Sequence, residues 1–485
     1  MSSYKPFLCV LLAPALFLAS CSGFKLTSGG GVASGTATLS LTLVATPPTP
    51  PPSLSLLSFS VDVTGISLTP STGTAQSVSL NSTTYTVDLT KLQSDSAFLG
   101  TSTTLPSGSY TSVTVSFSNP VLWYCIPATQ VAAGCAAGGV TRVIGGGTAP
   151  PITMPLTLTA HQQTGLAINF NLAKAISVNS QGVPSINLAA SNVLSANSLP
   201  ATATSLATGQ LDFVEDVIGV ITSVNASGQT VTVQTATRGN ITAKAGTTTV
   251  FSPNCTSQTF SCVLQGQVAS LDLALDTGGT FSLLEYDPLA ATTGDWVEGI
   301  VTTIPSSSTQ FQIVANDLVA SSTNSLLASS ASALVGAPVQ ITLVNPGIFT
   351  IDTKGLTVPV TSFGGTDASI LVPGQTVAVH VTSFTAASGS TPAAVIANTL
   401  ILRFTRVPGI VLAATFPTFS IQSLPPLFGL TTPKLVQLST GSPSTNYDGV
   451  TSGSSLTAGQ TVSIRALYYG PVSATPFSAA KVRVP

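Results

Sequence analysis

Apolar and polar residues alternate along most of this chain, and that alternation constrains the fold more than any other feature. In TATLSLTLVA, residues 36–45, apolar side chains recur at every second position, and comparable runs continue to the C-terminal end. A period of two places apolar side chains on one face of a β-strand. The runs are separated by clusters of Gly, Pro, Asn and Ser, which form turns. The pattern therefore predicts an all-β protein.

The second half of the chain contains three similar repeats. Each repeat opens with a similar strand, VIGVITSV, VEGIVTTI or VPGIVLAA, and later contains a Gly-Gln pair. We expect the opener glycines where strands bend or approach closely, and the Gly-Gln pairs at turns into the next strand. The opener glycines are Gly219, Gly299 and Gly409, and the Gly-Gln glycines are Gly266, Gly374 and Gly459.

These patterns predict an Ig-like or prealbumin-like β-sandwich followed by three small β-barrel-like repeats. We place the sandwich at residues 36–196 and a linker at 197–211. The barrel repeats are then expected at 212–290, 295–403 and 406–485. The middle repeat is longer, and its insertion includes residues 321–336, where a short helix is expected. A proline cluster between residues 47 and 52 predicts a loop.

Cys21 follows a short apolar segment, residues 7–18, with Lys5 in front of it. This arrangement is typical of a secretory signal peptide, and the segment is too short to span a bilayer. Leu18-Ala19-Ser20-Cys21 resembles the lipobox of bacterial lipoproteins. The resemblance implies that residues 1–20 are removed and that Cys21 carries lipid chains that attach the protein to the cell envelope. The alternative is an ordinary signal peptide with a chance cysteine.

The residues after Cys21 indicate how the protein is held. Ser22, rather than Asp, favours the outer membrane in the lipoproteins that this motif resembles. Residues 21–35 are rich in Gly and Ser and predict a flexible tether.

Two further resemblances concern the folded part. The strands around VDVTGISL and TVDL, followed by LPSGSYT, resemble an uncharacterised sandwich domain at the front of bacterial lipoproteins. The three repeats resemble a small barrel domain of unknown function that accompanies it. Where that sandwich family has an acid before Ala-Pro, this chain has Ala45-Thr46-Pro47, which puts any ligand role of that acid in doubt.

Four cysteines follow Cys21 and form two local pairs in the sequence. Cys125 and Cys135 lie in the predicted sandwich, and Cys255 and Cys262 lie in the first repeat. The short spacing within separate domains predicts two local disulfides and export to an oxidising compartment. A zinc site would need C-x2-C pairs or nearby histidines. We therefore expect no metal and no other cofactor; the alternative is a cation bound by acids of the middle region.

Charged residues make up only 6% of the chain, and the formal net charge is -2. This composition argues against nucleic-acid binding, which requires a basic patch. The charges are unevenly distributed: more than half of the acids lie between residues 212 and 298, whereas bases outnumber acids from Arg403 onward. The chain has an acidic middle and a basic end.

The sequence contains no familiar catalytic motif. Two carboxylate pairs, Asp295 with Glu298 and Glu285 with Asp287, are candidates for glycosidic chemistry, but we expect them on solvated turns. His161 and His380 lie in different domains and are expected to be structural. Trp123 and Tyr124 precede Cys125, and they either stack on a sugar or partner, or pack in the core.

We therefore expect a lipid-anchored, non-enzymatic binding or structural protein of the bacterial envelope. Beyond the membrane, its expected partner is a polysaccharide or an envelope protein, and not nucleic acid. The alternatives are a glycan hydrolase that uses acids of the middle region, and a subunit of an envelope assembly.

Replacing Cys21 with Ser should abolish lipid attachment and the associated cleavage, because acylation requires the thiol. Folding should be unchanged, since the tether separates residue 21 from the first strand. Labelling of cells with radioactive palmitate measures the attachment. As a control, the fragment from Thr36 behind an ordinary cleavable signal should be soluble and contain both predicted disulfides. A requirement for detergent would contradict the predicted lipid tether.

Overall fold

The computed structural model describes residues 35–47, 54–82, 85–127, 134–200, 213–275, 279–290, 294–304, 309–321, 325–328, 331–359, 368–429, 433–471 and 473–485. These residues are almost entirely β-structure, which confirms the predicted all-β fold class. Within them, no helix is long and apolar enough to cross a membrane. Cys21, the predicted signal peptide and most of the predicted tether lie outside the described residues, as does most of the proline cluster.

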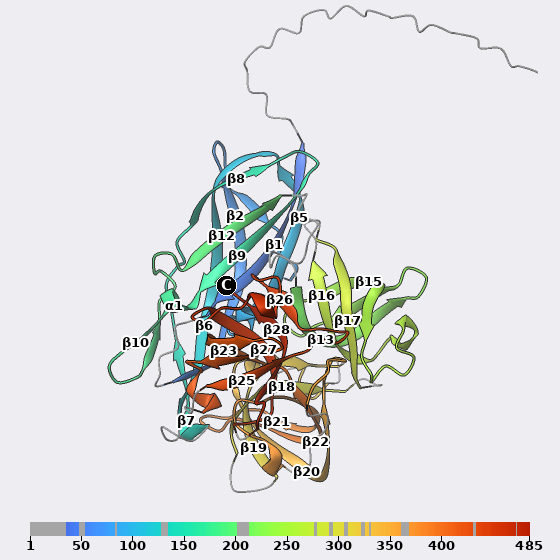
Figure 1. Ribbon diagram of the computed structural model, residues 1–485. Helices are drawn as coiled ribbons and strands as arrows, with labels where there is room; N and C mark the ends of the chain where they lie inside the picture. The colour runs from blue at the N-terminus through green and yellow to red at the C-terminus, as the bar shows by residue number, and fades with distance from the viewer. Residues whose placement is uncertain are drawn as a thin grey trace, which may run out of the picture. The chain divides into compact units, whose positions relative to one another are not determined.

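Residues 36–200 form a β-sandwich, whose strands are coloured blue to green in Figure 1. One sheet has the order β12-β9-β1-β5, and the other has the order β3-β2-β6-β7 with β4 beside β2 and β8 beside β6. Phe59 and Phe170 meet edge to face between the sheets, with ring centroids 5.9 Å apart. The last strand continues to Pro200, past the predicted end of the sandwich at residue 196.

The sandwich strands are β1 (Thr36–Thr46), β2 (Ser55–Pro70), β3 (Gln76–Val78), β4 (Tyr85–Asp88), β5 (Ala97–Pro106), β6 (Gly108–Pro127), β7 (Cys135–Ile144), β8 (Ile152–Leu158), β9 (Gln163–Asn171) and β12 (Leu194–Pro200). A short helix, α1 (Leu172–Ala175), and a two-stranded ribbon of β10 (Ile176–Val178) and β11 (Pro184–Ile186) connect β9 to β12.

Three five-stranded rings follow the sandwich. The first two are closed barrels, in the orders β13-β14-β15-β17-β16 and β18-β19-β20-β22-β21. The third ring, β23-β24-β25-β28-β27, is closed by the parallel pairing of β25 with β28, and β26 is an additional strand beside β28. Each ring contains one parallel pair, formed by its third and its last strand in chain order: β15 with β17, β20 with β22, and β25 with β28. All three rings therefore share one topology.

The barrel strands are β13 (Phe213–Asn225), β14 (Thr230–Gln234), β15 (Asn240–Phe251), β16 (Val268–Leu275), β17 (Phe281–Ala290), β18 (Trp296–Thr303), β19 (Gln310–Val319), β20 (Pro338–Ile351), β21 (Thr376–Thr385), β22 (Ala393–Arg403), β23 (Thr405–Thr415), β24 (Thr418–Gln422), β25 (Lys434–Leu438), β26 (Asn446–Asp448), β27 (Thr461–Tyr468) and β28 (Phe477–Arg483). The helix α2 (Ala331–Leu334) lies in the predicted insertion. Single turns of 3-10 helix occupy Lys91–Gln93, Phe260–Cys262, Ala368–Ile370, Pro426–Phe428 and Gly453–Ser455.

The Gly-Gln pairs form the same turn in all three barrels. Each glycine has a positive φ, between 88° and 93°, which glycine adopts at little cost. The glutamine side chain then accepts a hydrogen bond from the backbone N–H three residues earlier, at 2.6 to 2.9 Å. The predicted turn is therefore pinned by its own glutamine: Gln267 to Leu264, Gln375 to Val372 and Gln460 to Thr457.

The opener glycines lie where two strands approach closely. A Cβ at Gly219 would overlap the carbonyl oxygen of Gln234 on β14, and a Cβ at Gly299 would lie 2.5 Å from the carbonyl oxygen of Val314 on β19. Gly409 has slightly more room, because the nearest carbonyl oxygen would be 3.2 Å away. These residues are glycine because a side chain would separate the strands that close the barrel.

Both local cysteine pairs lie within disulfide distance. Cys125 at the end of β6 is joined to Cys135 at the start of β7, with Cα atoms 5.3 Å apart. Cys255 is joined to Cys262 in the connection between β15 and β16, with Cα atoms 5.6 Å apart. Each bond closes a short loop and restricts the unfolded chain.

Substituting Gly219 with Ala should lower the free energy of unfolding by about 1–3 kcal/mol, because the new methyl group must displace β14. Gly65→Ala is the matched control, since a Cβ at Gly65 meets nothing within 4 Å. The control should be unchanged or slightly more stable. Urea unfolding compares the two, and equal stabilities would contradict the close approach.

Candidate binding cleft

The carboxylates expected on solvated turns are buried, and that expectation was wrong. Glu298 and Asp287 lie within strands β18 and β17 and are 2% and 0% exposed. Asp295 accepts backbone hydrogen bonds from Ser321 and Leu326, so it fixes the start of the insertion. Burial of a charged carboxylate requires compensating partners.

Those partners are buried bases, most of them in the second and third barrels, and acids and bases together form what we call the buried ion cluster. The acids and bases joined in it by ion pairs are Asp95, Glu215, Asp216, Asp272, Asp287, Glu298, Asp317, Asp352 and Asp448 with Lys91, Arg238, Lys354, Arg403, Arg406, Arg465, Lys481 and Arg483. The cluster draws residues from the sandwich and from all three barrels.

Arg403 and Asp216 connect the three barrels at the centre of this cluster. Arg403, at the end of β22, lies 3.0 Å from Glu298 and also contacts Asp352 and Asp216. Asp216 also lies 2.7 Å from Arg406 of the third barrel. The register of β13 with β16 shifts between Val214 and Val217, and Asp216 has a φ of 52°. A bulge of this kind re-aims a side chain, which explains how Asp216 faces the cluster from within a strand.

The environment moves the pKa values of two cluster acids in opposite directions. Burial alone would raise the pKa of Asp272, but the charges of Arg465 and Lys354 outweigh it and hold the pKa at about 2. Burial and the neighbouring Asp287 raise the pKa of Asp352 to about 8, despite Arg403. Asp272 is therefore ionised at neutral pH, whereas the surroundings of Asp352 favour its protonated form, which still accepts a hydrogen bond from Arg403.

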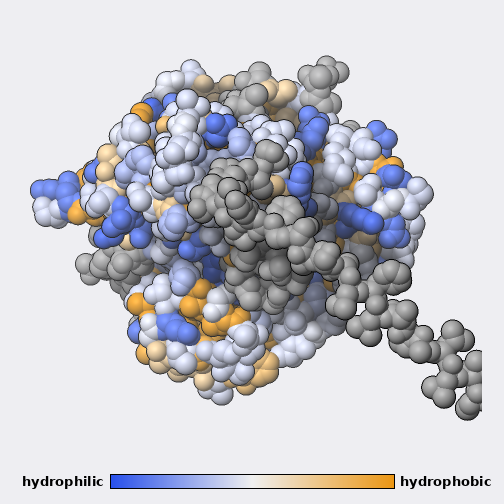
Figure 2. Space-filling view, turned by 90° about the horizontal axis from the view of Figure 1, so that it is seen from above, coloured by the Kyte–Doolittle hydropathy of each residue, from blue (hydrophilic) through white to orange (hydrophobic). Residues whose placement is uncertain are grey.

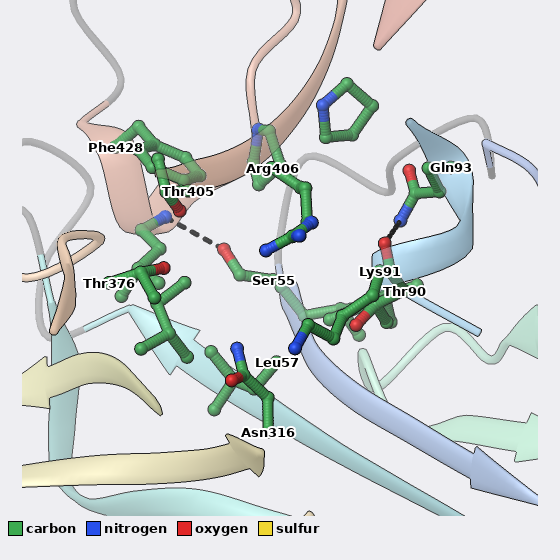
Figure 3. Close-up of a pocket in the computed structure, with 16 residues that line it drawn as sticks. Ser55, Leu57, Thr90, Lys91, Gln93, Asn316, Thr376, Thr405, Arg406 and Phe428 are labelled. Atoms are coloured by element: carbon green, nitrogen blue, oxygen red, sulfur yellow. Dashed lines mark hydrogen bonds between the residues drawn. The ribbon is translucent and has the colours of Figure 1, made fainter. Parts of the chain in front are cut away.

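A small cavity beside the cluster lies where the sandwich meets the second and third barrels (Figure 3). It has a volume of about 50 Å³, which suits a few water molecules and not an organic ligand. Lys91 and Arg406 reach it from opposite walls, and buried polar atoms of Gln93, Asn316 and Thr405 line it.

A larger cleft of about 480 Å³ lies between the sandwich and the second barrel. Trp123 on β6 and Arg142 on β7 form its sandwich wall, and these residues are directly opposite each other across the two strands. The guanidinium carbon of Arg142 lies 5.9 Å from the centroid of the Trp123 ring. Most of the other described lining residues are small or polar. These other residues are Ala136, Gly139, Val140, Thr303, Gln312, Ala333, Ala337, Pro338, Ala387, Gly389, Ser390, Thr391 and Pro392.

The two aromatic residues before Cys125 have different environments, because neighbouring residues of a strand face opposite sides of its sheet. Tyr124 is 5% exposed. Trp123 is half-buried, with part of its surface packed on the core and part lining the cleft. The disulfide between Cys125 and Cys135 holds the ends of the two strands that present Trp123 and Arg142.

The histidines lie apart from this cleft. His380 on β21 contacts the Asn398 side chain at 2.9 Å and packs against Trp296, with ring centroids 5.3 Å apart. His161 is exposed in the turn before β9. Neither histidine is among the residues that line the cleft.

Comparison with known proteins assigns only the sandwich. Residues 36–189 match the family model described as a domain of unknown function, DUF4382. The match covers the strands that carry Trp123 and Arg142, but not the three barrels. No curated protein matches the chain.

Asp352→Asn should make the free energy of unfolding depend less on pH between about 4 and 8. In the unfolded chain, the pKa of an Asp side chain is about 3.9. Over this interval the folded protein holds a proton that the unfolded chain lacks, so stability falls as pH rises. The asparagine resembles the protonated acid and removes that slope. Urea unfolding at pH 5 and pH 8 measures it.

Asp216→Asn is the control for this experiment, because the same substitution there removes a charge that Lys354, Arg403 and Arg406 all contact. It should cost about 3–5 kcal/mol. If Asp352→Asn proved equally costly at pH 8, Asp352 would have to carry its negative charge in the folded protein.

Proposed function

We propose that this protein is a lipid-anchored, non-enzymatic module of the bacterial envelope that binds a polysaccharide in the Trp123 cleft. The observation that carries the proposal is the position of Trp123, which lines a cleft of ligand size while its other contacts fix it to the core. An aromatic ring held in this way offers a rigid apolar surface to the face of a sugar.

The rest of the lining supports the same ligand. Thr303 and Gln312 on the second barrel, with Ser390 and Thr391 in the loop before β22, provide hydroxyl and amide groups. Such groups both donate and accept hydrogen bonds, as sugar hydroxyls do. None of the described residues that line this cleft is acidic, so a metal ion is a poor candidate ligand.

Membrane attachment rests on the sequence of residues 18–21, and the sandwich and barrels then serve as the part that the tether presents. An envelope protein is the alternative partner for the same cleft. Pull-down from solubilised membranes with and without competing polysaccharide distinguishes these two partners.

The chain contains only two tryptophans, which allows a direct test of the cleft. In Trp296→Phe, the remaining Trp123 should change its fluorescence when a bound polysaccharide covers it. In the matched variant Trp123→Phe, the remaining Trp296 is 2% exposed and should not respond. Trp123→Ala should weaken binding about tenfold, or about 1.4 kcal/mol. A response from Trp296 alone, or from neither residue across a polysaccharide panel, would contradict the proposed site.

A glycan hydrolase is the second candidate, and one pair of residues favours it. Asp272 and Glu285 are directly opposite on β16 and β17, and both line a pocket of about 260 Å³. Burial raises the pKa of Glu285 well above its usual range, while that of Asp272 is lowered. Carboxyls with divergent pKa values are typical of acid–base pairs. However, Asp272 already accepts hydrogen bonds from Lys354 and Arg465 at 2.8 Å, which weakens it as a base.

Glu285→Gln separates the two functions. If the protein hydrolyses glycans, this substitution should abolish hydrolysis and leave Trp123-dependent binding intact. We expect no release of reducing sugars from any polysaccharide that binds, with either the native chain or the variant. Reducing-sugar release that depends on Glu285 would favour the hydrolase.

A further inference from the structure

The buried ion cluster leaves few charges on the surface of the described part of the chain. Among the described residues whose side chains are placed, the exposed charged residues are Arg142, Lys174 and Lys244, and all three are basic. Much of the face in Figure 2 has pale colours of intermediate hydropathy, with scattered stronger blue and orange. A ligand that selects by charge therefore meets few groups on this surface.

Arg142 differs from the other arginines of the chain. Arg238, Arg403, Arg406, Arg465 and Arg483 are all ion-paired with buried carboxylates. Arg142 is exposed and forms no ion pair within the described residues. Its guanidinium lies over the ring of Trp123, which limits the conformations of an otherwise flexible side chain.

We infer that the cleft binds an acidic polysaccharide and that Arg142 recognises the carboxylate of a uronic acid residue. The inference rests on the proposed function and names the ligand class of the same site. A guanidinium presents its donors in a planar fork that matches the two oxygens of a carboxylate. The cation–π contact with Trp123 restricts that fork in advance, so less conformational freedom is lost on binding.

The lining favours a polysaccharide over other polyanions. In the described part of the cleft lining, Arg142 is the single charged residue, and Lys174 and Lys244 lie elsewhere, on α1 and β15. Polymers with a phosphate at every unit, such as nucleic acids, are bound by several bases along one groove. One guanidinium among hydroxyls and amides instead fits a sugar with one carboxylate and several hydroxyls. The neutral walls provide partners for those hydroxyls.

Polygalacturonate and its fully methyl-esterified form test the inference, because they differ only in whether the carboxylate is free. The full chain carrying Trp296→Phe is titrated with each polymer, and Trp123 fluorescence reports binding. We expect polygalacturonate to bind at least tenfold more tightly than the ester. Adding Arg142→Gln should remove that difference, since a neutral amide cannot form a charge-assisted pair with the carboxylate. Arg142→Lys should restore it only in part, because a lysine offers no planar fork.

Lys174→Gln and Lys244→Gln are the matched controls, since each removes one exposed positive charge outside the cleft. Both should bind polygalacturonate as the unsubstituted protein does. Equal binding of the two polymers, or an equal loss in all three Gln variants, would overturn the inference. So would tighter binding of an oligothymidylate of comparable charge. If neutral polysaccharides alter Trp123 fluorescence without this preference, the proposed function stands and the inference falls. If no polysaccharide binds, both fall.

Discussion

Compensation of buried charge is the constraint on which the rest of this structure depends. Arg403 ends the second barrel, Asp216 lies in a bulge of the first, and Arg406 begins the third, and their charges are in contact. At the sandwich, Arg483 donates hydrogen bonds to the carbonyl oxygens of Leu92 and Asp95 at 3.3 and 2.8 Å. A buried ion is costly when its partner is absent, so separation of any one part would expose or strand charges. The cluster therefore specifies how the parts fit together more than it adds to stability.

The folds of the individual parts could be predicted from sequence because their causes are local. Alternation in residues 36–45 identifies the first strand, and Gly266 followed by Gln267 identifies a turn whose hydrogen bond spans three residues. The burial of Glu298 could not be predicted in the same way. Its partner Arg403 is more than a hundred residues away, and a strand pattern shows which face a residue occupies without showing what covers it. The available signal was the uneven distribution of charge, with acids in the middle of the chain and bases at its end. In a chain with so few charged residues, such opposite charges are expected to pair.

The candidate site shows the same limit at a finer scale. The sequence indicated Trp123 as a candidate because it lies just before Cys125. It did not decide whether the ring contacts a sugar or packs in the core. In the structure, part of the Trp123 side chain packs on the core and part lines the cleft. Arg142 was missed, because the register of β6 with β7 shifts between Cys125 and Pro127 and the cysteine pairing alone does not place Arg142 opposite Trp123. The opposite wall, with Thr303 and Gln312, comes from the second barrel, and no local pattern predicts how that barrel packs against the sandwich.

The distribution of charge also bears on how a nearly uncharged surface selects a ligand. Many of the polar groups on the described surface are hydroxyl and amide side chains, which bind many polar molecules with little discrimination. On a surface rich in both signs of charge, an exposed arginine is commonly paired with a nearby carboxylate that a ligand must displace. Here the carboxylates near the other arginines are buried with them, so Arg142 has no competing acid among the cleft residues that the structure describes. A carboxylate that reaches Arg142 therefore gains the interaction with its guanidinium without first breaking an ion pair.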